Sequence, residues 1–278
     1  MRTDQLFEQW NTDTSAIMAE TIKRIGPCDV FIGGSLADDL GTAGSDVDLY
    51  CFRATEAQTS PFPIHTTCGD ARLELYIVNV NSAMSGDSSL RSLVTDNPPP
   101  APHRWPLLSP QRFRQMHALY RDCALSAGEA SSAARVALAP DLLHIYAGLR
   151  AILNAGALAE DLLMHDCAER APTRLYCARL LAESAIDAAL STQELVNPNP
   201  KWRLQLASRA GFTDPRFPET DRLLHALFPD ISDAEKAIAQ CLAIAADCLH
   251  LVVAEGSLRR FPSVGESLEL VEAAANGK

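Results

Sequence analysis

A proline-rich segment at residues 95–106, TDNPPPAPHRWP, divides the sequence into two parts with different hydrophobic patterns. Proline fixes φ and lacks a backbone N–H, which excludes this segment from a helix interior and from a central strand. Short β-type runs precede the segment, and almost every stretch after it has a helical pattern. The sequence therefore predicts an α+β fold with a small mixed-sheet domain at residues 1–108, followed by an all-helical C-terminal bundle at residues 109–278.

The expected elements follow from the spacing of apolar residues. One helix is expected at 3–26, and strands are expected at 28–32 (CDVFI), 46–52 (DVDLYCF) and 72–80 (RLELYIVNV). Most helical segments of the second part open with Ser, Thr, Asp or Pro and close near Gly or Pro, as helix ends should. These segments are 109–128, 139–156, 173–191, 220–228 and 232–256.

Composition restricts the class of partner. The chain has 278 residues and a formal net charge of −11, which disfavours a nucleic-acid polymer because such partners are bound through clustered Lys and Arg. The first residues include acids, and no apolar run has the length that a bilayer crossing needs, so we expect a cytoplasmic protein without a membrane partner. Eight cysteines occur without a C-x-x-C pair, and this pattern indicates neither a zinc site nor a disulfide framework.

The stretch FIGGSLADDLGTAGSDVDLYCF, residues 31–52, is a strand, a glycine turn and a second strand. Gly33 and Gly34 carry no side chain, so backbone N–H groups can approach a ligand, and the N-terminus of the short segment after Gly34 adds its dipole. Together with Ser35, the turn is predicted to bind the phosphates of a nucleotide. Taken alone, a GGS sequence is also typical of an ordinary tight turn.

Carboxylates follow the turn in a pattern typical of a metal site. Asp46 and Asp48 are one residue apart in an extended segment, so both side chains face one side of the strand, and two such oxygen ligands suit Mg²⁺. On the third expected strand Glu74 shares a face with Arg72 and Tyr76, and an adjacent position in the sheet would place Glu74 beside the aspartates. Each carboxylate alone would suit a solvated strand face, whereas the combination indicates a metal site at Asp46, Asp48 and Glu74.

The segments GGSLADDLGTAGSDVDLY and SDVDL resemble the G-S…D-x-D signature of the polymerase-β-type nucleotidyltransferase superfamily. With LELYIV and the helical second half, the chain is similar to the aminoglycoside (streptomycin/spectinomycin) adenylyltransferases, a group that confers antibiotic resistance. The resemblance implies Mg²⁺-dependent transfer of AMP from ATP, or of another NMP from its NTP, with two metal ions and Glu74 as catalytic base. GLRAILNAG resembles the helix of that group that carries an ATP-contacting arginine, which would be Arg150. The lysine that usually follows near the nucleotide is missing here, where Glu160 and Asp161 stand instead.

Several alternatives stay open at this point. Glu74 is either the base that deprotonates the acceptor hydroxyl or a ligand of the second metal ion. The acceptor is a small molecule such as an aminoglycoside or a biosynthetic intermediate, held by the helical half in a cleft between the domains. A protein-modifying nucleotidyltransferase and an inactive nucleotide-binding module are the rival interpretations. The basic stretch at 197–218, with Arg203, Arg209 and Arg216, is expected to be a solvated loop.

Overall fold

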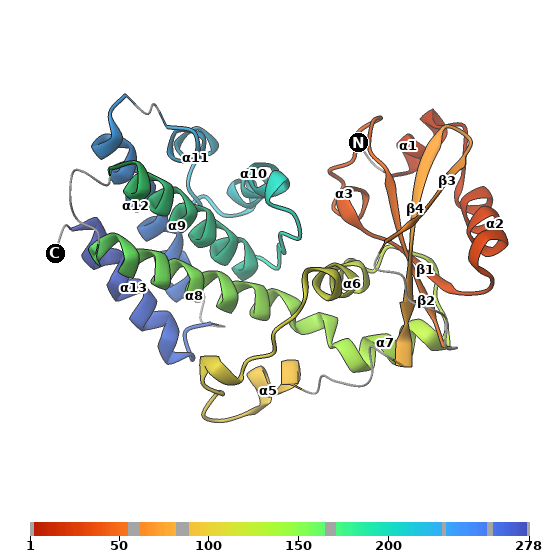
Figure 1. The fold of residues 1–278 in the computed structure, drawn as a ribbon, viewed down its shortest axis with the longest axis horizontal. Helices are drawn as coiled ribbons and strands as arrows, with labels where there is room; N and C mark the ends of the chain where they lie inside the picture. Colours follow the sequence, from red (N-terminus) through yellow and green to blue (C-terminus); the bar gives the residue numbers. More distant parts are fainter. Residues whose placement is uncertain are drawn as a thin grey trace. The chain divides into compact units, whose positions relative to one another are not determined.

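The computed structural model of the chain describes residues 3–54, 62–81, 89–164, 171–229, 232–254 and 258–276. The predicted α+β class is confirmed, with a mixed sheet in the N-terminal part and a helical C-terminal region (Figure 1). The contacts divide the chain into two compact units, Met1–Leu143 and His144–Lys278. The expected boundary at 108/109 lies inside the first unit, because residues 109–143 contribute two helices and a strand that pack with the sheet.

The sheet of the first unit has five strands in the order β3-β4-β2-β1-β5. β2 and β4 are parallel, and the other neighbouring pairs are antiparallel. The three predicted strands are confirmed as β1, β2 and β4, whereas β3 and β5 at the two edges were not predicted. The strands are β1 Asp29–Ile32, β2 Val47–Arg53, β3 Ile64–Cys68, β4 Ala71–Asn79 and β5 Ala124–Ser126.

Two of the predicted helices are shorter than expected. The helix expected at 3–26 is two helices, because Asn11 has a φ of 51° and the Asp13 side chain caps a new start by accepting from the Ala16 N–H. The helix expected at 109–128 ends before Asp122, whose φ of 54° is left-handed, and β5 follows. The helices are α1 Thr3–Gln9, α2 Thr14–Ile25, α3 Gly34–Ala37, α5 Ser89–Thr95, α6 Pro110–Arg121 and α7 Glu129–Leu138, with 3-10 turns η1 Pro102–Arg104 and η2 Pro140–Leu142.

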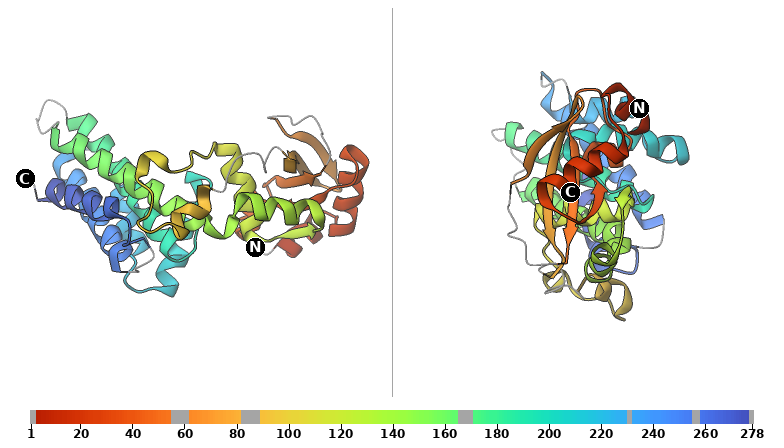
Figure 2. Two further views of the ribbon diagram at one scale, coloured as in Figure 1. Left: turned by 90° about the horizontal axis from the view of Figure 1, so that it is seen from below. Right: turned by 90° about the vertical axis from the view of Figure 1, so that its right-hand side faces the viewer.

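The two faces of the sheet carry different kinds of side chain. One face is apolar and packs against α1 and α2 (Figures 1 and 2), and its buried residues include Val30, Ile32, Val47, Leu49, Leu73 and Leu75. The other face carries Phe31, Tyr50, Asp48 and Glu74, and α6 and α7 pack against it. Alternation along the strands thus separates a hydrocarbon core from a face with aromatic rings and carboxylates.

The second unit is a helical bundle in which α12 packs against α9, α11 and α13, and α10 packs against α9 and α11 (Figure 1). α8 lies close to its neighbours at two glycines: a Cβ at Gly148 would collide with Ser191 of α9, and one at Gly156 with Ser267 of α13. The elements are α8 Leu143–Met164, α9 Ala171–Thr192, η4 Pro200–Trp202, α10 Arg203–Thr213, α11 Thr220–Leu227, α12 Ala234–Ala254 and α13 Pro262–Ala275.

Two helical segments of the described chain, Pro140–Met164 and Ala234–Ala254, are long and apolar enough to cross a bilayer by length and composition. The expectation that no stretch reaches this length was therefore wrong. Core helices of water-soluble bundles pass the same test, and many apolar side chains of α12 are buried in the bundle.

Candidate functional site

The turn after β1 is built from glycines that lie against β2. The Gly33 N–H donates to the Asp48 carbonyl (2.8 Å), and a Cβ at Gly33 would overlap the Tyr50 ring. Gly34 has a φ of +59°, and a Cβ there would overlap the Asp48 carboxylate. A side chain at either position would displace a β2 residue, so the predicted turn requires glycine in this structure. α3 is a single turn, so backbone N–H groups, rather than a long helix dipole, are what this segment offers an anion.

The structure brings Asp48 and Glu74 together. In the parallel pairing of β2 with β4, Asp48 is the direct partner of Glu74, and the two side chains lie on the same face of the sheet. The Tyr76 hydroxyl donates to Glu74 Oε2 (2.7 Å), and the Tyr76 ring stacks on Tyr50 with centroids 5.0 Å apart. His65 Nδ1 of β3 lies 3.6 Å from Glu74 Oε1. Glu74 is thus held in place by its neighbours on β3 and β4.

Asp46 lies just before β2 and is held by an arginine. Its Oδ1 is 2.8 Å from Arg72 Nε, and Arg72 also donates to the Gly44 carbonyl (2.7 Å). The sequence placed Arg72 on the face of Glu74 but gave no sign of this ion pair. Within the described ranges no three His, Cys, Asp or Glu side chains are grouped as a metal site. Of the expected three-carboxylate cluster, the structure makes Asp48 and Glu74 direct neighbours, whereas Asp46 is paired with Arg72.

Burial and nearby negative charges raise the pKa values of two side chains on this face of the sheet, Asp48 and Tyr76. Burial raises the pKa of Asp48 from 3.8 to about 6, and the negative charges of Glu74 and Asp46 add to the rise, whereas the positive charge of Arg114 opposes it. Burial also raises the pKa of Tyr76, and the hydrogen bond to Glu74 adds to that rise, so the hydroxyl stays a neutral donor. The face has a surplus of negative charge near Asp48 that a bound cation would relieve.

Two basic residues of α6 lie beside Asp38, the acidic residue that follows the glycine turn. Asp38 is buried, and its Oδ1 is 3.0 Å from Arg121 Nε while its Oδ2 is 3.4 Å from Nε2 of the buried His117. The sequence pattern did not reveal these partners of Asp38. The four-residue spacing of His117 and Arg121 on an expected helix is the signal that could have indicated a shared partner.

The second unit contains Arg150, Glu160 and Asp161, all exposed on α8. Their roles stay predictions. The stretch at 197–218 is not the solvated loop that was expected, because it contains α10 and a buried arginine, Arg203.

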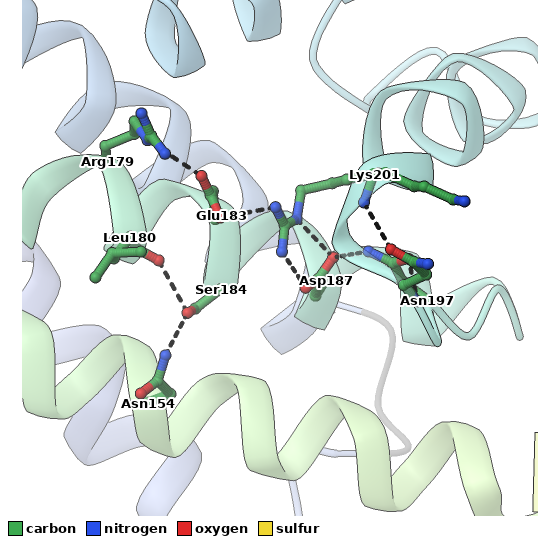
Figure 3. A network of polar contacts seen from close by, with 10 residues as sticks. Asn154, Arg179, Leu180, Glu183, Ser184, Asp187, Asn197 and Lys201 are labelled. Carbon is green, nitrogen blue, oxygen red and sulfur yellow. Dashed lines mark hydrogen bonds and ion pairs between the residues drawn. The ribbon is translucent and has the colours of Figure 1, made fainter. Parts of the chain in front are cut away.

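Arg203 is the centre of a network of ion pairs in the second unit (Figure 3). Its Nε and Nη2 donate to the two oxygens of Asp187, and its Nη1 donates to Glu183 Oε2 (2.8 Å). Asn197 also donates to Asp187 (2.9 Å), and Arg179 donates to Glu183 (3.2 Å). Because both carboxylates of α9 are matched by arginines, the network fastens the start of α10 to α9 and leaves no surplus charge for a phosphate.

No protein-family model matches the sequence, and no curated protein matches it.

Proposed function

We propose that the protein is a Mg²⁺-dependent nucleotidyltransferase that moves an NMP, AMP from ATP in the first instance, to a hydroxyl of a small acceptor. One observation carries the proposal: the parallel register places Glu74 beside Asp48, and the Gly33–Gly34 backbone packs directly against Asp48. A phosphate-binding turn and paired carboxylates at one place are the parts that nucleotidyl transfer needs.

The donor set fits Mg²⁺. Asp46, Asp48 and Glu74 offer hard carboxylate oxygens, and burial together with the negative charges of Glu74 and Asp46 raises the pKa of Asp48. Asp46 and Asp48 would hold the ion, with Glu74 as a further ligand where two ions bind. Bound Mg²⁺ would polarise the nucleotide phosphates and stabilise the attacking and leaving oxygens.

The chain's own residues then have separate tasks. The backbone of Gly33 and Gly34 and the hydroxyl of Ser35 bind the β- and γ-phosphate oxygens. The acceptor oxygen attacks the α-phosphorus, the bond to the bridging α,β-oxygen breaks, and pyrophosphate leaves. Glu74 accepts the proton of the acceptor hydroxyl, and the Tyr76 hydrogen bond on Oε2 fixes the orientation of that carboxylate.

The acceptor is proposed to be a small molecule, and a cationic one such as an aminoglycoside or an amino-alcohol intermediate suits the net charge of −11. In this proposal the first unit, Met1–Leu143, contains the nucleotide-binding part and the helical region binds the acceptor, with Arg150 as a nucleotide contact. The reaction would take place in the cytoplasm, with antibiotic resistance as the consequence where the acceptor is a drug.

The experiment is a transfer assay with each of the four NTPs and Mg²⁺ against a panel of aminoglycosides and biosynthetic amino alcohols. Pyrophosphate release and transfer of an α-phosphate label to the acceptor are measured for wild type, Asp46→Asn and Asp48→Asn. Glu8→Gln, at an exposed position of α1, is the matched control. We expect transfer by wild type and the control, and none by the two aspartate variants. Near-normal transfer by Asp48→Asn would contradict the proposal.

A further inference from the structure

α6 covers the glycine turn at close range. The Ala118 side chain lies 3.6 Å from the place that a Gly33 Cβ would occupy, so the helix packs directly on the turn. The next helical turn is fastened to the segment after α3 by the Arg121–Asp38 ion pair and by His117. The position of α6 relative to the predicted phosphate turn is therefore determined by packing and charge together.

Arg114 precedes Ala118 by four residues and so lies on the same side of α6, one helical turn away. Its side chain is exposed. Because one turn of an α-helix rises about 5.4 Å, an arginine one turn from Ala118 is long enough for its guanidinium to reach a ligand held at the Gly33–Gly34 turn.

Several other arginines of the first unit have carboxylate partners. Arg72 pairs with Asp46, Arg121 pairs with Asp38, and Arg135 pairs with Asp122. Among the residues that the structure describes, Arg114 has no carboxylate within ion-pair distance. A guanidinium beside an anion-binding turn has donors in a planar fork that matches phosphate oxygens.

We propose that Arg114 binds the β- and γ-phosphates of the nucleotide, and thus the pyrophosphate that leaves. This inference rests on the proposed nucleotidyltransferase function and adds the protein cation for the leaving group. As the bond between the α-phosphorus and the bridging oxygen breaks, negative charge accumulates on pyrophosphate, and Arg114 stabilises that charge from α6.

The test compares binding of two nucleotides in the presence of Mg²⁺ by calorimetric titration. The probes are the non-transferable α,β-methylene analogue of ATP, which carries the β- and γ-phosphates, and AMP, which lacks them. The variants are Arg114→Gln and Arg114→Lys, with Lys23→Gln as the control. Lys23 is an exposed cation of α2, the helix on the apolar side of the sheet. Thermal melts verify that each variant is folded.

We expect Arg114→Gln to weaken binding of the triphosphate analogue about 10- to 100-fold, the usual effect of losing charge-assisted hydrogen bonds. Its affinity for AMP should change by less than about threefold, Arg114→Lys should recover part of the loss, and Lys23→Gln should behave as wild type. Wild-type affinity of Arg114→Gln for the analogue, or an equal loss for both nucleotides, would overturn the inference alone. Failure of wild type to bind the analogue in Mg²⁺ would contradict the proposed function as well.

Discussion

Asp48→Asn is predicted to stabilise the metal-free protein at neutral pH. The substitution keeps the size of the side chain and removes a charge that lies half-buried beside Glu74. Wild type keeps this charge without a compensating metal ion when EDTA is present. The variant should therefore have a higher free energy of unfolding than wild type, although it loses the proposed activity.

The magnitude follows from the pKa of Asp48. Its value rises from 3.8 to about 6 on folding, a change of about two units, and each unit corresponds to about 1.4 kcal/mol. Because the folded-state pKa is raised, the unfolded chain ionises more readily, and ionisation of Asp48 lowers the stability of wild type as pH increases. The cost in wild type is about 3 kcal/mol at pH 8 and about 1.5 kcal/mol at pH 5, and it vanishes below the unfolded pKa.

The assay is urea unfolding of wild type, Asp48→Asn and the control Glu8→Gln in EDTA at pH 8 and pH 5. We expect the advantage of Asp48→Asn over wild type to be about twice as large at pH 8 as at pH 5. Addition of Mg²⁺ and nucleotide should stabilise wild type and the control but not Asp48→Asn, since ligands that bind only the folded state raise its stability.

Two results would contradict a raised pKa of Asp48 in the folded protein. An equal stability difference at both pH values would show that Asp48 titrates alike in the folded and unfolded states. Lower stability of Asp48→Asn at pH 8 in EDTA would show that its charge is balanced within the folded protein.

Three further substitutions test other parts of the account. Glu74→Gln should leave Mg²⁺–nucleotide affinity nearly unchanged and lower the single-turnover rate by about 10²- to 10⁴-fold; a large loss of affinity with little loss of rate would instead indicate a metal ligand. Gly34→Ala should lower stability by at least about 1–2 kcal/mol in urea unfolding, because its φ is +59° and its methyl group would displace the Asp48 carboxylate; wild-type stability would contradict this. Arg203→Met should lower the free energy of unfolding by about 3 kcal/mol, because Glu183 and Asp187 lose their partner. The control Arg216→Gln removes a more exposed ion pair and should change it by under about 1 kcal/mol. Equal effects of the two substitutions would show that the Arg203 ion pairs contribute no more than an exposed pair.

The local sequence pattern was sufficient to predict the strands that carry the candidate site. Alternation of apolar residues predicted β1, β2 and β4 and put Asp48, Glu74 and Tyr76 on the polar side of the sheet. The structure adds the parallel register that makes Asp48 and Glu74 direct neighbours. Register depends on pairing between segments about 25 residues apart, which no local pattern specifies.

The errors arose where tertiary contacts decide local structure. A helix was expected up to residue 128, whereas its last part forms β5, whose backbone pairs with β1 in the sheet. Asp122 adopts a left-handed conformation and ends α6 before β5 begins. Arg203 was expected in a solvated loop, whereas its ion-pair partners on α9 hold it in a buried position. The pairing of Asp38 with Arg121 likewise joins residues that are far apart in the sequence.

The proposed site, formed by the Gly33–Gly34 turn with Asp48 and Glu74, is tested most directly by the Mg²⁺ dependence of nucleotide binding. Calorimetric titration of each of the four NTPs into wild type and Asp48→Asn, with Mg²⁺ and with EDTA, measures it without knowledge of the acceptor. We expect wild type to bind at least one NTP strongly in Mg²⁺, and we expect EDTA or Asp48→Asn to remove most of this affinity. Binding of no NTP, or equal affinity with Mg²⁺ and with EDTA, would contradict this expectation.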